Sequence, residues 1–234
     1  MIQTLRACTV VIAGGLALAS LSAPTSAAVI VFSGSDEGAG EVDPRPGSDA
    51  AAAAFDLALG TFGLITFESD PLGPFASLTV APGVTLTGTD YFGENQTILN
   101  SPVAAPELYG YNTTAAGSQF ASAFGGSFTF TFETKILAFG LYVSGLQGGP
   151  STISFNDGLP QVVNIPIIDG GIAFVGFIDP GARISRIQIE FGGDNVAIDD
   201  ARYGANNAPV PEPGTLALIG SGLAGLAVRR RRSS

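Results

Sequence analysis

Apolar and polar positions alternate along most of the middle of the chain, which predicts β-strands. The clearest case is 127–133, where three phenylalanines alternate with threonines and a glutamate, so that the rings share one face. Short apolar runs recur roughly every ten residues between Gly-, Asn- and Asp-rich turns, a spacing typical of an antiparallel sandwich. The predicted strands are 29–33, 62–68, 77–80, 84–87, 127–133, 136–144, 152–155, 162–165, 172–178, 186–191 and 195–203.

Two of these strands differ from the rest, and one region has no clear pattern. Residues 136–144 are apolar on both faces, as expected of a central strand that is covered on each side. Residues 186–191 have one polar face, which predicts an edge-like strand. Residues 90–126 show few apolar pairs at any period and predict long loops with one or two short strands. No repeat is evident, which argues against a solenoid or propeller.

One helix is predicted, at residues 49–59. Ser48 is suited to cap it, Asp49 to its first turn, and Gly60 to end it after an alanine-rich run. The fold class is therefore mainly β: an antiparallel, jelly-roll-like β-sandwich with one short helix.

The N-terminal segment predicts a secretory signal peptide over residues 1–28. Arg6 is its only charge, an apolar core follows at 8–21, and small residues stand at Ser26 and Ala28. A helix inside a folded domain would not need this order of charge, apolar core and small residues. We expect signal peptidase to cut after Ala28 or Ala27, so that the chain is exported across the inner membrane.

The C-terminal segment, 206–234, contains three unlike parts in a fixed order. Pro211, Glu212 and Pro213 hold the chain extended before an uncharged run at 214–228. As a helix this run would span about 22 Å, less than the roughly 30 Å hydrocarbon core of a bilayer. The basic cluster Arg229, Arg230, Arg231 and Arg232 follows, which favours a cytoplasmic C-terminus. An ordinary single-span anchor is the alternative interpretation of this short hydrophobic span.

This order of Pro-Glu-Pro triplet, short apolar span and arginine cluster closely resembles the PEP-CTERM sorting signal of Gram-negative bacteria. The resemblance implies recognition by an exosortase, a membrane-embedded transpeptidase that would cut near Pro211–Pro213. It also implies transient attachment to the inner membrane through 214–228, and then delivery to the cell surface or extracellular matrix. The resemblance covers only the end of the chain, and it concerns how the protein is sorted rather than what its body does.

The body between these two segments, residues 29–205, forms one predicted domain with a limited chemistry. The chain has no histidine, and its single cysteine, Cys8, lies in the signal peptide. Ser-His-Asp, Cys-His and histidine-ligated zinc chemistry are therefore excluded. Five basic residues stand against nineteen acidic ones in the body, a formal charge of −14. Such a surface repels phosphate backbones, so nucleic acid is not expected as a partner.

A second resemblance concerns the two ends of the body. Its early strand ending in Glu68 and its late strand containing Asp199 and Asp200 are similar to the paired strands of jelly-roll modules of the MAM and carbohydrate-binding type. That resemblance implies one structural Ca²⁺ held by these three residues. Ca²⁺ takes oxygen ligands and would relieve the repulsion between adjacent carboxylates. The alternative is that these carboxylates are hydrogen-bonded to backbone or solvated.

These features predict an exported surface or matrix protein whose non-catalytic body binds polysaccharide. A carboxylate-dependent glycan hydrolase, using Glu68 with Asp199 or Asp200, is one alternative. A passive surface protein without ligand is another. Sugar-binding modules stack sugars on exposed aromatic rings, and the body has five tyrosines for this role: Tyr91, Tyr109, Tyr111, Tyr142 and Tyr203.

Overall fold

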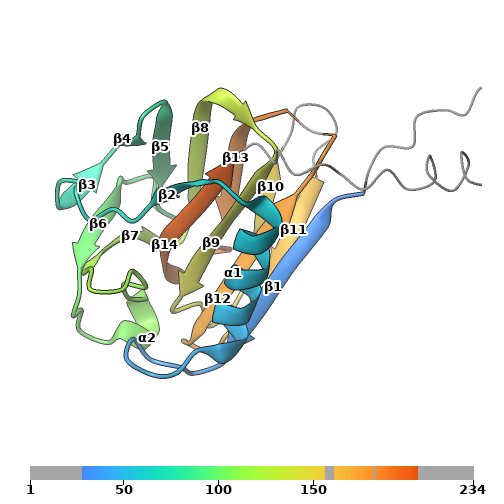
Figure 1. The fold of residues 1–234 in the computed structure, drawn as a ribbon. Helices are drawn as coiled ribbons and strands as arrows, with labels where there is room; N and C mark the ends of the chain where they lie inside the picture. The colour runs from blue at the N-terminus through green and yellow to red at the C-terminus, as the bar shows by residue number, and fades with distance from the viewer. Residues whose placement is uncertain (1–27, 156–160, 182, 205–234) are drawn as a thin grey trace, which may run out of the picture.

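Two antiparallel β-sheets packed face to face, with a helix against the outside of one of them, make up the body of the chain (Figure 1). The computed structural model describes residues 28–155, 161–181 and 183–204. The predicted sorting segment, and the predicted signal peptide apart from Ala28, lie outside these residues. The predicted fold class, a mainly β antiparallel sandwich, is confirmed.

The larger sheet has eight strands and the smaller has six. In the larger sheet the order is β1 (Ile30–Asp36), β12 (Ile172–Ile178), β9 (Ala138–Ser144), β14 (Asn195–Gly204), β7 (Gln119–Phe124), β6 (Gln96–Asn100) and β3 (Gly73–Phe75), and β2 (Gly63–Ile65) pairs with β14. In the smaller sheet the order is β11 (Gln161–Ile165), β10 (Ser151–Phe155), β13 (Ile184–Glu190), β8 (Ser127–Ile136), β5 (Val84–Thr89) and β4 (Ser77–Ala81).

The main core lies between the two sheets. Phe128 and Phe130 of β8 are fully buried and Phe132 is nearly so, which confirms the predicted shared face. Phe155 of β10 stacks on Phe177 of β12, with the ring centroids 3.8 Å apart, and so joins the smaller sheet to the larger.

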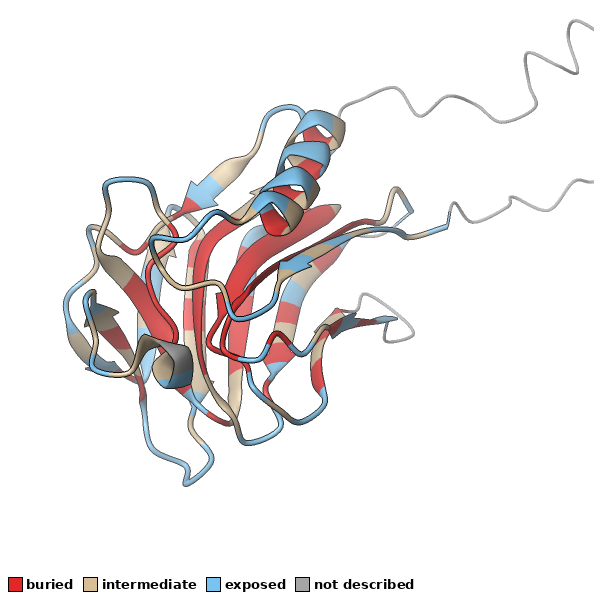
Figure 2. Ribbon diagram, turned by 90° about the horizontal axis from the view of Figure 1, so that it is seen from below, coloured by how far each residue is buried: buried red, intermediate tan, exposed pale blue. Residues whose placement is uncertain are grey.

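A second, smaller core lies on the outer face of the larger sheet, beneath α1 (Pro46–Leu59). Phe55 of α1 is fully buried and packs against the rings of Phe32 and Phe174. Strand β9 is therefore buried along its whole length, as its two apolar faces predict. Figure 2 shows the buried strands between the helix and the second sheet.

Helix α1 begins earlier than predicted, and Ser48 is not its cap. The helix starts at Pro46, after Arg45, which makes no side-chain capping bond. Asp36, at the end of β1, accepts hydrogen bonds from the backbone N–H groups of Gly47 (2.9 Å) and Ser48 (2.8 Å) instead. A residue eleven and twelve positions upstream of these N–H groups thus satisfies them at the helix start.

Several strand predictions need correction. Strand β13 lies between β10 and β8, so the 186–191 segment is not at an edge. The apolar run at 136–144 is divided at Leu137, where the chain passes from the smaller sheet into the larger one. The predicted strand at 62–68 is reduced to Gly63–Ile65, because Phe67 has a positive φ of 59° and turns the chain. The 90–126 region contains β6, β7 and a one-turn helix, α2 (Pro106–Tyr109).

The first and last described strands, β1 and β14, have their chain ends at the same end of the larger sheet, measured along the strands. Ile30 pairs with Ile178, Ile178 with Ala138, and Ala138 with Gly204. The loops at 145–150 and 191–194 adjoin the other ends of these strands, at the opposite end of the sandwich. Within the described residues, no helix combines the length and the apolar character that a membrane crossing needs.

Candidate functional site

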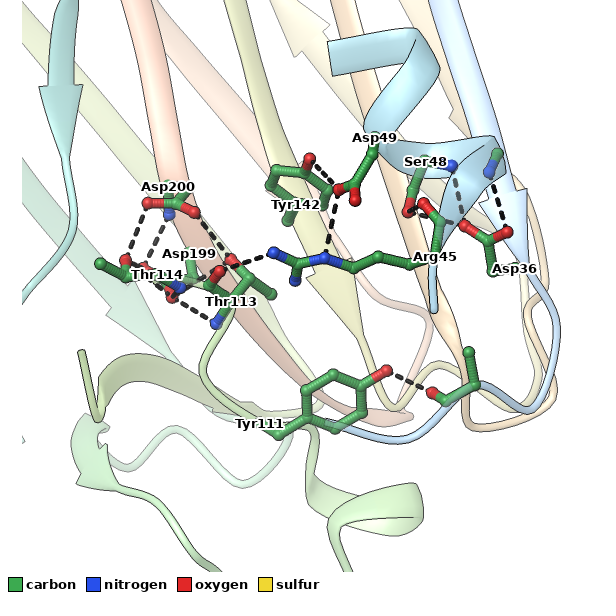
Figure 3. Close-up of polar contacts among 12 residues, drawn as sticks. Asp36, Arg45, Ser48, Asp49, Tyr111, Thr113, Thr114, Tyr142, Asp199 and Asp200 are labelled. Carbon is green, nitrogen blue, oxygen red and sulfur yellow. Dashed lines mark hydrogen bonds and ion pairs between the residues drawn. The ribbon is translucent and has the colours of Figure 1, made fainter. Parts of the chain in front are cut away.

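The structure places Asp199 and Asp200 at an irregularity in β14, where they bind the loop that follows α2 (Figure 3). Asp199 Oδ2 accepts hydrogen bonds from the backbone N–H groups of Thr113 (2.7 Å) and Thr114 (3.1 Å). Each threonine hydroxyl also lies within hydrogen-bonding distance of both carboxylates. Asp200 has a positive φ of 47°, and its N–H donates to Asp199 Oδ1 at 2.7 Å.

Asp199 is almost fully buried, and this changes its acidity. Burial and, secondly, the neighbouring charge of Asp200 raise the pKa of Asp199 to about 7, against the opposing effect of the N–H groups that donate to it. Asp199 therefore holds a proton over most of the acidic range. It is closed off from any substrate.

Glu68 does not join this pair. Its Oε1 accepts hydrogen bonds from the backbone N–H groups of Ser118 and Gln119, both at 2.9 Å. The adjacency of the two strands is nevertheless as predicted, since Ile65 of β2 pairs with Ala201 of β14. The positive φ at Phe67 then turns the chain, so Glu68 does not lie beside Asp199 and Asp200 on β14.

The arrangement does not fit the predicted calcium ligand set. In the part of the chain that the structure describes, no three His, Cys, Asp or Glu residues gather closely enough to hold a metal ion. N–H and O–H donors occupy the oxygens of Asp199 and Asp200, whereas a cation needs free oxygen lone pairs. Calcium binding stays a prediction from the sequence.

A further group of polar side chains ties α1 to the same loop (Figure 3). Arg45 donates from Nη2 to the carbonyl oxygen of Thr113 at 2.8 Å and forms a 3.1 Å ion pair with Asp49. Tyr142 donates from its hydroxyl to Asp49 at 2.8 Å, and the Arg45 guanidinium lies 5.0 Å from the centre of its ring. Burial raises the pKa of Tyr142 above its ordinary value. These contacts hold α1 and the loop against the sheet.

An open surface suitable for a ligand lies among the loops at the end of the sandwich opposite the two chain ends. Two adjacent hollows, of about 410 and 370 Å³, both include Gly192 and Gly193 in their walls. The remaining lining residues of the larger hollow are Tyr91, Gly126, Ser127 and Glu190, and those of the smaller are Gln147, Gly148, Gly149 and Asp194.

Exposed aromatic side chains gather at this end. Among the described phenylalanines and tyrosines, three are exposed: Tyr91 (70%), Phe92 (74%) and Phe124 (48%). Tyr91 and Phe92 meet edge to face with their centroids 5.5 Å apart. The backbone N–H of Tyr91 donates to the carbonyl of Phe124, so the loop that carries Tyr91 and Phe92 adjoins the end of β7, where the Phe124 ring stacks on Tyr109. Large apolar side chains grouped on a surface commonly mark a binding site.

The loop that carries Tyr91 is held in shape by Asp90. The side chain of Asp90 accepts hydrogen bonds from the N–H groups of Phe92 (2.8 Å) and Glu94 (2.6 Å). Its own N–H donates to the carbonyl of Glu94. A Cβ built on Gly193 would lie 3.7 Å from Cδ2 of Tyr91, so the ring rests against a floor without side chains.

Asp194 holds in shape the loop at 147–149, which lines the smaller hollow, as Asp90 does for the loop that carries Tyr91. Its Oδ2 accepts hydrogen bonds from the backbone N–H groups of Gln147 (2.5 Å) and Gly148 (2.8 Å), across a sequence separation of 46 to 47 residues. Oδ1 accepts a third, from the N–H of Asn195. The two hollows are therefore formed by loops fixed in place before any ligand arrives.

Of the five tyrosines considered from the sequence, Tyr91 alone is exposed in a hollow. Tyr111 and Tyr142 are buried, and Tyr109 and Tyr203 are half-buried. Sequence reasoning overlooked Asp194, Gln147 and the neighbouring glycines. The glycine pairs at 148–149 and 192–193 were a detectable signal, but nothing in their separation along the chain indicated that they meet.

Comparisons with known proteins give different matches for the C-terminal segment and for the body. Residues 209–232 match the PEP-CTERM protein-sorting motif. No match was found among curated proteins.

The body has matches among solved structures. They include the carbohydrate-binding module TmCBM61 in complex with β-1,4-galactotriose (14% identity, 60% of this chain and 94% of that chain, TM-score 0.32). A family 29 carbohydrate-binding module complexed with mannohexaose matches at 16% identity (64% and 96% covered, TM-score 0.32). A xylan-binding domain of family 22 matches at 15% identity (63% and 96% covered, TM-score 0.34). Likeness at this level says nothing of what this chain binds.

Proposed function

We propose that this chain is an exported surface protein, sorted through its C-terminal motif, whose body binds polysaccharide at the paired hollows without cleaving it. The observation that carries the proposal is the exposed ring of Tyr91 on the glycine floor of the larger hollow. Sugar rings have apolar faces that stack on aromatic side chains, while backbone groups and polar side chains bind their hydroxyls. The match at 209–232 supports the sorting part of the proposal.

The position of the hollows suits a protein held at its C-terminus. The sorting motif follows shortly after Gly204, the last residue of β14, whereas Gly192 and Gly193 stand just before the first residue of that strand. A ten-residue strand is about 30 Å long. The hollows therefore lie at the end of β14 that is far from the attached end of the body.

The non-catalytic part of the proposal concerns the carboxylates that the sequence offered as a catalytic pair. Asp199 and Asp200 are 1% and 8% exposed, and Glu68 is engaged by two backbone N–H groups. A glycosidase needs an acid and a second carboxylate that both face the scissile bond. The pairings of Glu68 with Asp199 or Asp200 do not supply this.

The test is a glycan array probed with the protein recovered from its cell surface, followed by titration of each positive glycan. Replacing Tyr91 by Ala should weaken binding about tenfold or more, because stacking is lost. Leu57→Ala is the matched control, since Leu57 is an 87% exposed side chain on α1, remote from the hollows. Equal binding by Tyr91→Ala and wild type would contradict the proposed site. Release of reducing ends by the wild-type protein would contradict the non-catalytic part.

A further inference from the structure

We infer that the ligand of the paired hollows is an uncharged glycan chain of at least two sugar units, lying across Gly192 and Gly193. This inference rests on the proposed function and specifies the class of ligand. Gly192 and Gly193 belong to the walls of both hollows, so the two spaces adjoin along this glycine pair. A chain can therefore occupy both at once.

The two hollows differ in the contacts that they provide. The larger has the Tyr91 ring and Ser127, which suit one stacked sugar with a hydroxyl bound at its edge. The smaller has no aromatic lining residue, and its wall consists of glycine backbone, Gln147 and Asp194. Backbone groups and an amide side chain suit hydrogen bonding to sugar hydroxyls. One unit would stack and its neighbour would be held by polar contacts.

The charge around the hollows disfavours acidic sugars. The ionisable lining residues are Glu190 and Asp194, and Asp90 and Glu94 stand in the loop that carries Tyr91. None of the lining residues is Lys or Arg. A uronic acid or sulfated sugar placed here would meet like charges without a cationic partner. An uncharged glycan meets no such penalty.

Gly148 allows the smaller hollow to be closed selectively. A Cβ built on Gly148 has no heavy atom within 4 Å, and its φ lies outside the region that disfavours side chains. Because Gly148 lines the smaller hollow and its Cβ would meet open space, a phenylalanine there can be accommodated at the wall of the hollow without displacing the protein. Gly148→Ala is the matched control, because its methyl group leaves most of the hollow open.

The experiment measures binding of the surface-recovered protein to uncharged oligosaccharides of glucose, mannose, xylose and galactose with increasing numbers of units, and to oligogalacturonates of the same lengths. For the bound sugar, affinity should rise about tenfold or more from one unit to two or three. Gly148→Phe should remove this gain, whereas Gly148→Ala should keep it. The oligogalacturonates should bind about tenfold or more weakly at low salt. Circular dichroism of each variant checks that the fold is retained.

The outcomes separate the inference from the proposed function. Oligogalacturonates that bind as tightly as uncharged chains would overturn the ligand class and leave the proposed function standing. Equal affinity for one unit and for longer chains, or an unchanged gain in a folded Gly148→Phe variant, would overturn the two-unit span. If neither series binds, the proposed function fails, and this inference fails with it.

Discussion

Raising the pH from about 5 to about 8 should destabilise this protein, because it ionises the buried carboxyl group of Asp199. The pKa of Asp199 is raised from 3.8 to about 7 by burial and by the charge of Asp200. A raised pKa adds stability that is complete below the unfolded value and lost as the pH rises through the folded value. Because one pKa unit corresponds to about 1.4 kcal/mol, the whole effect is on the order of 4 kcal/mol. Roughly half or more of it falls between pH 5 and pH 7.

The assay is urea unfolding at a series of pH values, followed by far-ultraviolet circular dichroism, since the chain has no tryptophan. The chain also has no histidine, so no side chain with an ordinary pKa titrates in this window. The free energy of unfolding should fall by about 1.4 kcal/mol per pH unit between about pH 5 and pH 7 and then become constant. Burial also raises the pKa of Asp56 and of Asp70, so these carboxyl groups add a smaller fall of the same sign. Asp199→Asn should remove most of this slope, because the amide does not ionise.

A free energy of unfolding that stays constant or rises between pH 5 and pH 7 would refute the reasoning. The same titration, repeated with Ca²⁺ and with a chelator, tests the calcium ion predicted from the sequence. A cation bound between Asp199 and Asp200 would stabilise their ionised forms, so stability would rise with pH when Ca²⁺ is present. Identical curves with and without Ca²⁺ would contradict a calcium site at this pair.

The remaining predictions concern the helix, the second core and processing. Asp36→Ala should cost about 1–2 kcal/mol of unfolding free energy in urea, since it removes the acceptor for the first N–H groups of α1. Burial acts to raise the pKa of Asp36, but hydrogen bonds from Ser48 and Gly47 outweigh it, so this contribution should be lost as the pH falls below about 4. Phe55→Ala should cost about 3–5 kcal/mol, because the ring fills the space beneath α1; a loss under 1 kcal/mol would contradict this packing. Mass spectrometry of the surface protein should find a C-terminus upstream of 214; intact Arg229–Arg232 there would contradict exosortase cleavage.

Much of the fold could be predicted from the sequence, because alternation along a strand is a local property. The buried face of β8 and the two-sided burial of β9 follow from which residues stand at every second position. The helix at 46–59 was also detectable in its alanine-rich run, but its start was not. Asp36 caps it from another element, and this partner is invisible until β1 and α1 are brought together.

The candidate site could not be predicted in the same way. The resemblance to jelly-roll modules grouped Glu68, Asp199 and Asp200 on strands expected to pair, and β2 does pair with β14. The backbone turn at Phe67 nevertheless separates Glu68 from the other two. The hollows combine loops at 90–94, 125–127, 147–149 and 190–194, whose closeness depends on strand order.

The sequence by itself determined the C-terminal sorting motif, the strand-forming pattern and the lack of histidine and thiol chemistry in the body, since each depends on residues that are close in the chain or on simple composition. Only the tertiary structure decided that Asp199 is buried against Thr113, that Tyr91 stands exposed over Gly193, and that the hollows lie at the end opposite Gly204. The physical reason is that burial and proximity are set by the pairing of strands distant in the chain, and side-chain acidity and exposure follow from that pairing.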